Sequence, residues 1–299
     1  MNKPACFVAQ VDLSLASKLE EDLKNQGFEM SKPQYTLFQA KKKGISCTLY
    51  ESGKLTVQGK DKDDFISFYL EPEILGSLTY SYPDVNQDKT PHIGVDEAGK
   101  GDVFGPLCIG AVFADEEGIS ELSKLGVRDS KRMTDPTILK LAEQIRKKFS
   151  YALVKIFPQK YNELYDKFHN LNSLLGWGHA TAIEDVLKKS PCQKVTIDKF
   201  ASEHVVASAL QRKGIEVELT QRHKGEEDIV VAAASIIARA AFVEGIEKLS
   251  EEFQLQLPKG ASPAVIQAGR QFVAKHGRAL LPRIAKMHFK TLEEIQAIH

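Results

Sequence analysis

The spacing of hydrophobic and polar positions divides the chain into two regions. Residues 13–26 place leucines at helical intervals, whereas residues 35–60 alternate and break at Lys-Gly, Ser-Gly and Gln-Gly pairs. This pattern predicts a helix followed by a meander of short strands joined by tight turns. Residues 61–76 predict a second helix that Pro72 interrupts. The first region is therefore predicted to be a small α+β unit.

A segment near residues 79–92 has no apolar period and contains two prolines together with Asn, Asp, Thr and Ser. Such a composition is typical of a linker between domains. We predict a small α+β domain over residues 1–80, a linker over 81–92 and a larger domain over 93–299.

The larger region alternates strand patterns with helix patterns. Residues 92–99 and 106–115 predict two strands that a short glycine-rich link joins as a hairpin. Further strands are predicted at 151–157, 194–198 and 214–220, and helices at 134–149, 172–189, 230–249, 262–275 and 291–298. Hairpins combined with parallel-type crossovers predict an α/β domain.

Composition narrows the function classes only slightly. The chain is 42% hydrophobic and 27% charged, as is usual for a soluble globular protein, and no apolar run reaches the ~18–20 residues of a membrane span. No signal peptide is recognised, and the four cysteines form no CxxC pair, which predicts reduced thiols in the cytoplasm. Basic and acidic residues balance at 40 each, so nucleic-acid affinity must come from local patches.

Two adjacent carboxylates, Asp96 and Glu97, end the first strand of the larger region and precede a glycine-rich turn. Carboxylates are ligands that magnesium prefers, and glycines let a backbone approach a polyanion. A solvated hairpin turn is an equally simple interpretation. A dinucleotide fingerprint is disfavoured because the glycines read GxGxxxG, and no Ser or Thr follows Gly-Lys as in a Walker A loop.

Other acids occupy positions from which they can converge on this pair. Asp198 ends the strand 194–198, where an acid costs desolvation unless a cation or partner meets it, although it also serves as a strand terminator. Residues 226–228, Glu-Glu-Asp, precede an apolar helix, where acids commonly interact with the helix dipole. Two metal ions need about four carboxylates, so the conjunction favours a metal site.

The stretch DEAGKGDVFGPL at 96–107 resembles the signature of bacterial ribonuclease HIII, of the type 2 ribonuclease H family. Further matches follow in the family's order: GVRDSKRMTD at 126–135, TIDKFA at 196–201, VAAASIIARAAF at 231–242 and LPKGASP at 257–263. The resemblance implies a ribonuclease H-like α/β domain with a mixed sheet and flanking helices. It also implies a substrate-binding N-terminal domain similar to one repeat of the TATA-box-binding protein.

The resemblance carries functional roles onto matching residues. The implied catalytic carboxylates are Asp96, Glu97, Asp198 and Glu226, the first three as ligands of magnesium or manganese. Glu227 stays open as the fourth acid, because the segment before Ser235 is one residue shorter than the family pattern. The implied substrate-binding residues are Gly99, Lys100 and Gly101 at the ribose 2′-hydroxyls, and Ser130 and Lys131 near the phosphates.

The implied activity is endonucleolytic hydrolysis of the RNA strand of an RNA–DNA hybrid, with a metal-activated water and 5′-phosphate and 3′-hydroxyl products. Two alternatives stay open: excision of single ribonucleotides from DNA, as by type HII enzymes, and non-catalytic hybrid binding. The expected partner is the hybrid duplex, with no membrane and no obligate protein partner, and the protein is expected to be a cytoplasmic monomer.

Lysines 41–43, beside Tyr35, Phe38 and Gln39, form the basic feature that is predicted to grip the hybrid. Residues 1–90 contain 11 lysines, no arginine and 13 acids, so net charge does not favour this role. Trp177 and His179 have helical spacing and are interpreted as core residues.

Overall fold

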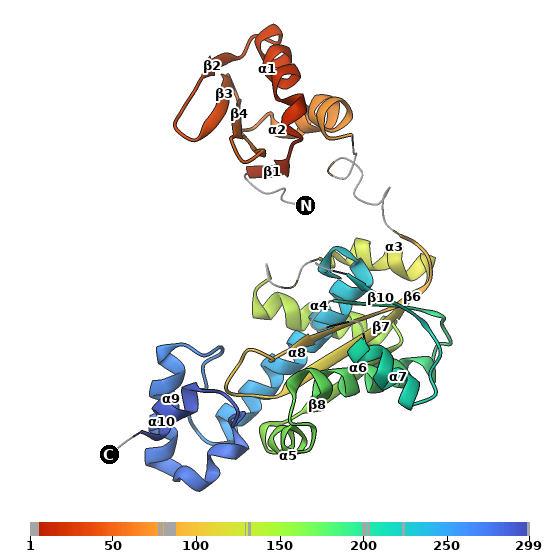
Figure 1. The fold of residues 1–299 in the computed structure, drawn as a ribbon, viewed down its shortest axis with the longest axis vertical. Helices are drawn as coiled ribbons and strands as arrows, with labels where there is room; N and C mark the ends of the chain where they lie inside the picture. The colour runs from red at the N-terminus through yellow and green to blue at the C-terminus, as the bar shows by residue number, and fades with distance from the viewer. Residues whose placement is uncertain are drawn as a thin grey trace. The chain divides into compact units, whose positions relative to one another are not determined.

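The chain folds into two compact units, residues 1–87 and 88–299 (Figure 1). The computed structural model describes residues 6–76, 80, 88–128, 130, 133–198, 202, 204–222 and 225–297, with Glu226 described by its backbone alone. Most of the predicted linker, residues 81–87, lies outside the described residues.

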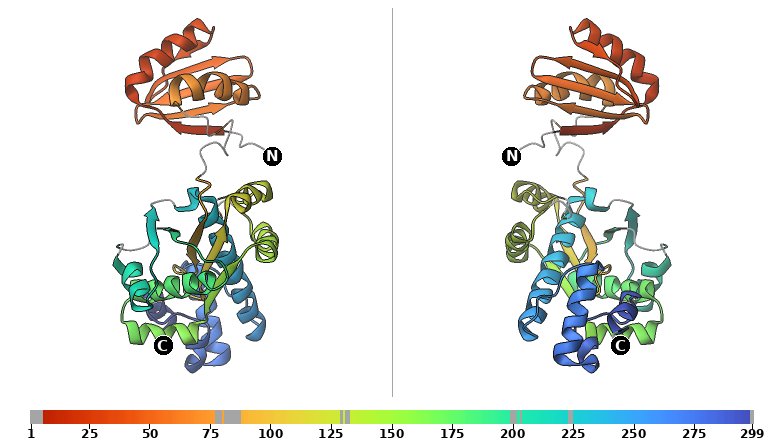
Figure 2. Two further views of the ribbon diagram at one scale, coloured as in Figure 1. Left: turned by 90° about the vertical axis from the view of Figure 1, so that its right-hand side faces the viewer. Right: turned by 90° about the vertical axis from the view of Figure 1, so that its left-hand side faces the viewer.

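The smaller unit is a five-stranded antiparallel sheet in the order β1-β5-β4-β3-β2, with helices on one face (Figure 2). The strands are β1 (Cys6–Gln10), β2 (Glu29–Ser31), β3 (Thr36–Lys42), β4 (Ile45–Tyr50) and β5 (Lys54–Gln58). The helical segments are η1 (Leu13–Leu15), α1 (Ala16–Asn25), α2 (Lys62–Phe65) and η2 (Ile66–Leu75).

Strand alternation builds the core of this unit. Leu55 and Val57 of β5 are fully buried in one cluster with Leu19 and Leu23 of α1, while Thr56 between them is only partly buried. The predicted interruption at Pro72 is wrong. The helix passes through Pro72, which lies inside the wide-turn π-helix η2.

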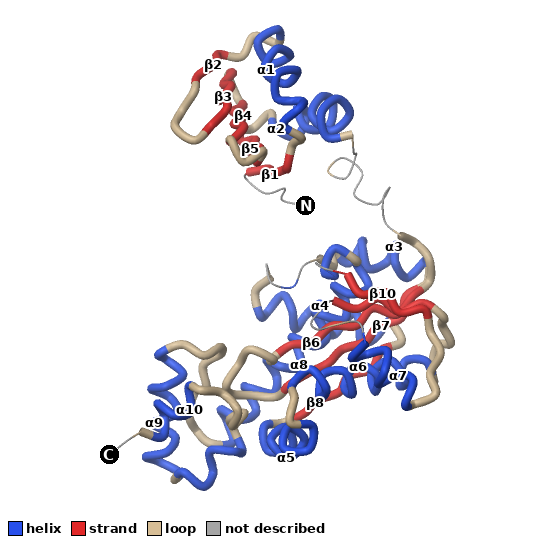
Figure 3. Tube along the Cα trace, viewed as in Figure 1, coloured by secondary structure: helices blue, strands red, loops and turns tan. Residues whose placement is uncertain are grey.

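The larger unit has a five-stranded mixed sheet in the order β10-β9-β6-β7-β8 (Figure 3). Strands β6, β7 and β8 are antiparallel neighbours, whereas β6, β9 and β10 are parallel. The strands are β6 (His92–Ala98), β7 (Leu107–Ala114), β8 (Tyr151–Ile156), β9 (Lys194–Asp198) and β10 (Glu218–Arg222). The predicted mixed α/β architecture is therefore confirmed.

Helices cover both faces of this sheet and extend beyond its end. They are α3 (Glu116–Leu125), α4 (Asp135–Lys148), α5 (Pro158–Phe168), α6 (Leu171–Leu187), α7 (His204–Arg212), η4 (Gly225–Glu227), α8 (Ile229–Glu252), α9 (Pro263–His276), η5 (Arg278–Arg283) and α10 (Thr291–Gln296). The α-helices α3, α5 and α7 and the short segments η4 and η5 were not predicted. For α3 the signals were present, because Asp115 caps its start and Gly126 ends it in the left-handed conformation.

Helix α8 lies directly on one face of the sheet, and α6 packs on the other. Along β7, Leu107, Ile109 and Ala111 share a core with α6, whereas Val112 shares one with α8. The approach of α8 to β6 is so close that a Cβ at Gly94 would overlap the backbone of the helix. Among the described helices only α8 has the length and apolarity of a membrane span, and 83% of that window is buried inside the fold.

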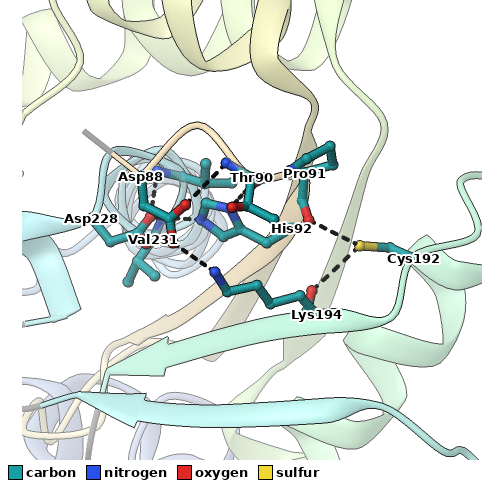
Figure 4. A network of polar contacts seen from close by, with 9 residues as sticks. Asp88, Thr90, Pro91, His92, Cys192, Lys194, Asp228 and Val231 are labelled. Carbon is teal, nitrogen blue, oxygen red and sulfur yellow. Dashed lines mark hydrogen bonds and ion pairs between the residues drawn. The ribbon is translucent and has the colours of Figure 1, made fainter. Parts of the chain in front are cut away.

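A polar network joins the start of β6 to the start of α8 (Figure 4). The buried His92 places Nδ1 2.7 Å from the Thr90 carbonyl and Nε2 3.0 Å from Asp228 Oδ1. Asp228 also caps α8 by accepting from the backbone N–H groups of Val230 and Val231. A neutral imidazole can donate from only one nitrogen. The Thr90 carbonyl and the Asp228 carboxylate therefore both accept a hydrogen bond from His92 only when the ring is protonated.

This geometry makes stability depend on pH. Burial opposes the charged ring, but the contacts to Asp228 and Thr90 outweigh it and raise the pKa of His92 above 6.5, and the pKa of Asp228 is lowered below 3.8. The stabilisation is complete between about pH 4 and 6.5 and is lost as pH rises through the raised pKa of His92. We expect His92→Gln to cost about 3 kcal/mol near pH 5 and clearly less near pH 9. Urea unfolding of both proteins at the two pH values checks this, and an equal cost at both would contradict it.

Candidate active site

Two carboxylates lie on the neighbouring parallel strands β6 and β9, directly after the last aligned pair of residues. The pairing of β6 with β9 aligns Gly94 with Thr196 and Val95 with Ile197, and the next residues are Asp96 and Asp198. Burial raises the pKa of Asp96 to about 7, and the charges of Glu97 and Asp198 add to the effect. The structure therefore brings the predicted residues Asp96 and Asp198 to neighbouring positions on adjacent strands, where their charges repel.

Glu97 points to the opposite face of the sheet, because successive residues of a strand alternate. There its Oε2 lies 3.1 Å from Nε2 of the fully buried His179 on α6, and its Oε1 accepts from Lys100 Nζ at 3.3 Å. Burial alone raises the pKa of Glu97, but these two contacts outweigh it and lower the pKa. His179 was interpreted as a core residue. It is buried, but it also orients a predicted catalytic acid.

Helix α8 supplies the support behind Asp96. Ser235 lies next to the Asp96 carboxylate and partly offsets the effect of burial on its pKa, and the hydroxyl oxygen of Ser235 lies 2.9 Å from that of Ser130. Ser130 is only 4% exposed, so its hydroxyl lies behind the acid pair. One turn along the helix, Arg239 donates to the carbonyls of Ser130 and Met133. Sequence reasoning missed both roles, although Ser235 is the single hydroxyl in an apolar stretch.

Both candidates for the fourth acid, Glu226 and Glu227, belong to the turn η4, which a hydrogen bond to Asp198 holds at the same edge of the sheet. The N–H of Gly225 donates to Asp198 Oδ1 at 2.9 Å. Glu226 follows in this turn, and the side chain of the alternative, Glu227, is exposed. Another predicted position, Lys131, lies outside the described residues.

The glycine-rich turn follows the acid pair directly. Gly99 has φ +84°, and a Cβ there would overlap the carbonyl of Pro106, whereas a Cβ at Gly101 would meet nothing within 4 Å. The side of the turn at Gly101 is therefore open to a ligand. The C-terminal half of the loop is fixed by a bridge between Phe104 and Ala285.

The donor set fits a hard divalent cation. Asp96 and Asp198 offer only oxygen ligands, and their mutual repulsion is the kind that a divalent ion relieves. Among the described side chains, no group of three or more His, Cys, Asp and Glu gathers as a metal cluster by itself. The alternation that turns Glu97 toward α6 gives the physical reason, and the side chain of Glu226 is not among those described.

The fold and the paired acids define a nuclease of the ribonuclease H type, and the comparisons with known proteins agree. The family model for Ribonuclease HII matches residues 93–292, and a model described as Domain of unknown function (DUF3378) matches residues 6–79. The structure of Bst-RNase HIII in complex with Mn2+ superimposes with a TM-score of 0.68 at 26% identity, covering 97% of each chain.

Two bacterial relatives are similar over nearly their full length. Ribonuclease HIII of Protochlamydia amoebophila is 55% identical over 97% of this chain and 96% of the relative, and that of Chlamydia caviae is 48% identical over 97% of both. The chain therefore belongs to the ribonuclease HIII family, which confirms the predicted resemblance.

The two glycines of the turn give a matched pair of substitutions. We expect Gly101→Ala to change the free energy of unfolding by less than about 0.5 kcal/mol, because the added methyl group meets no atom. It should raise the KM for substrate by about tenfold if a ligand approaches this side of the turn. Gly99→Ala should cost more than about 1 kcal/mol through its positive φ and the overlap with Pro106. Urea unfolding and steady-state kinetics of both variants check this, and an unchanged KM for Gly101→Ala would place the ligand elsewhere.

Proposed function

We propose that this chain is an endonuclease that hydrolyses the RNA strand of RNA–DNA hybrids with the help of magnesium or manganese. The observation that carries the proposal is that Asp96 of β6 and Asp198 of β9 follow the last aligned residues of two parallel strands, where burial and repulsion raise the pKa of Asp96 to about 7. An acid pair of this kind costs free energy in the free protein and is stabilised by a cation.

Asp96 and Asp198 are proposed to hold the metal, with Glu97 and Glu226 completing the set of catalytic acids. Bound divalent ions supply an activated water and neutralise charge on the phosphate. His179 and Lys100 keep Glu97 ionised and fix its orientation, while Ser235 only partly offsets the burial that raises the pKa of Asp96. The Gly99–Gly101 turn, open at Gly101, is proposed to contact the ribose 2′-hydroxyls.

The amide substitution Asp96→Asn tests the acid pair. It keeps the shape of the side chain but removes its charge, so we expect hydrolysis to fall by at least about 10³-fold while hybrid binding without metal changes little. The assay is cleavage of a labelled hybrid in magnesium and in manganese, with Asp166→Asn on the exposed surface of α5 as the matched control. Near-normal turnover of Asp96→Asn would remove the basis of the proposal.

The N-terminal unit is proposed to bind the hybrid through the sheet face that its helices leave open. The register aligns Ser31, Gln39, Thr48 and Thr56 in one row across four strands, and Gln39 donates to Thr48 at 3.1 Å. Hydroxyl and amide groups in such a row can donate to phosphate and sugar oxygens.

Two of the residues that were predicted to grip the hybrid, Phe38 and Lys42, do not lie on the open sheet face. Phe38 is 3% exposed and is a core residue, and the ammonium of Lys42 is held by the carbonyl of Gln26 at 2.8 Å. Tyr35 precedes β3 and is 71% exposed. Hydrogen bonding by the open face is therefore a better-supported source of affinity than the lysine run alone.

Deletion of residues 1–80 separates binding from chemistry. The acid pair and its supports lie entirely within residues 88–299, so we expect KM for a hybrid to rise by about tenfold or more while kcat changes by less than about threefold. Steady-state kinetics measures KM and kcat, and repeating it at a second salt concentration measures the loss of phosphate contacts. An unchanged KM would assign the N-terminal unit another role.

Finer points of the proposal concern substrate form, assembly and location. A continuous hybrid is the proposed substrate, and comparison with a duplex that carries one ribonucleotide distinguishes it from type HII excision. The protein is proposed to act as a monomer in the cytoplasm, which agrees with four cysteines that are all free thiols.

A further inference from the structure

One lysine is buried completely beneath the glycine-rich loop. Lys286, in the segment between η5 and α10, is 0% exposed, and its Nζ donates to the carbonyl of Asp102 at 2.8 Å and to that of Gly105 at 2.7 Å. The same ammonium lies 5.7 Å from the centre of the Tyr161 ring. An ammonium group has three donors, so these contacts use a large part of its capacity.

The surrounding backbone ties the same loop to the C-terminal segment. The N–H of Lys286 donates to Val103 at 2.9 Å, and that of Gly105 donates to Ile284 at 3.1 Å. In the segment before α9, the N–H of Gly260 donates to the Asp102 carboxylate at 2.6 Å. Residues 102–105 are thus held by segments of the chain that lie more than 150 positions later in the sequence.

A neutral side chain at this position would avoid the desolvation of a charge, but it would leave two loop carbonyls without their donor. Burial lowers the pKa of Lys286 to about 8, so the ammonium form still predominates at neutral pH. The buried charge is therefore better explained by what it holds in place than by packing alone.

We propose that Lys286 is a positioning residue that sets the Gly99–Gly101 turn for recognition of the ribose 2′-hydroxyl. The turn and the clamped residues are continuous, and the N–H of Asp102 closes the turn on the carbonyl of Gly99 at 3.4 Å. Lys286 holds Asp102 and Gly105, and the opposite side of the turn, at Gly101, stays open. This inference rests on the proposed function for the identity of the ligand, but not for the clamp itself.

The test compares Lys286→Met, which keeps the length of the side chain without a donor, with Lys290→Met on the exposed surface four residues later. Deuterium exchange of the metal-free protein should accelerate by about tenfold in peptides covering 99–106, with β7 and β8 unchanged. With metal, kcat/KM on a hybrid should fall by about 100-fold. The preference for that hybrid over one with a single 2′-deoxy substitution at the cleavage site should shrink, and Lys286→Arg should recover part of it.

Three results would overturn the proposal. They are exchange in 99–106 within about twofold of the unsubstituted protein, an unchanged ribose preference despite faster exchange, and equal effects of Lys290→Met. If Lys286→Met does not fold, Asp102→Ala removes the contact to Gly260 and is held to the same measurements. Absence of cleavage by the unsubstituted protein would count against the proposed function, while the exchange experiment would still decide the clamp.

Discussion

The burial of Asp96 beside the carboxylates of Glu97 and Asp198 is the constraint around which the larger unit is organised. The parallel strands β6 and β9 lie side by side, and the residues that follow their last aligned pair are Asp96 and Asp198. The pKa of Asp96 is raised because burial and a neighbouring charge both disfavour ionisation. Such a pair persists only if the surrounding structure supplies enough stability to hold it, and in exchange it forms a site that a divalent cation completes.

Helix α8 provides much of that stability, and its position is determined in its N-terminal half. Asp228 caps its first turn and pairs with the buried His92, which joins the helix to the start of β6. Its apolar first half then lies on β6 with no room for a side chain at Gly94. The helix therefore presents Ser235 to Asp96, and Arg239 to the carbonyls of residues 130 and 133, from a rigid support.

The two carboxylates of the Asp96–Glu97 pair are treated differently because a strand alternates its faces. Asp96 faces α8 and repels Asp198, whereas Glu97 faces α6 and is held by His179. The adjacent turn depends on yet another part of the chain, the C-terminal segment that contains Lys286. The candidate site thus draws on β6, β9, α6, α8 and the C-terminal segment together.

Local pattern determined much of this protein by itself. The alternating strands, the apolar helix of residues 229–252, the acids at strand ends and the glycine turn were all readable, because each depends on neighbouring residues and on short-range backbone preferences. The tertiary structure alone decided the partners of those groups. His179 and Ser235 read as ordinary core residues, and Lys286 gave no signal, since each acts on an element 82 or more positions away, and only packing of the sheet and helices brings such residues into contact.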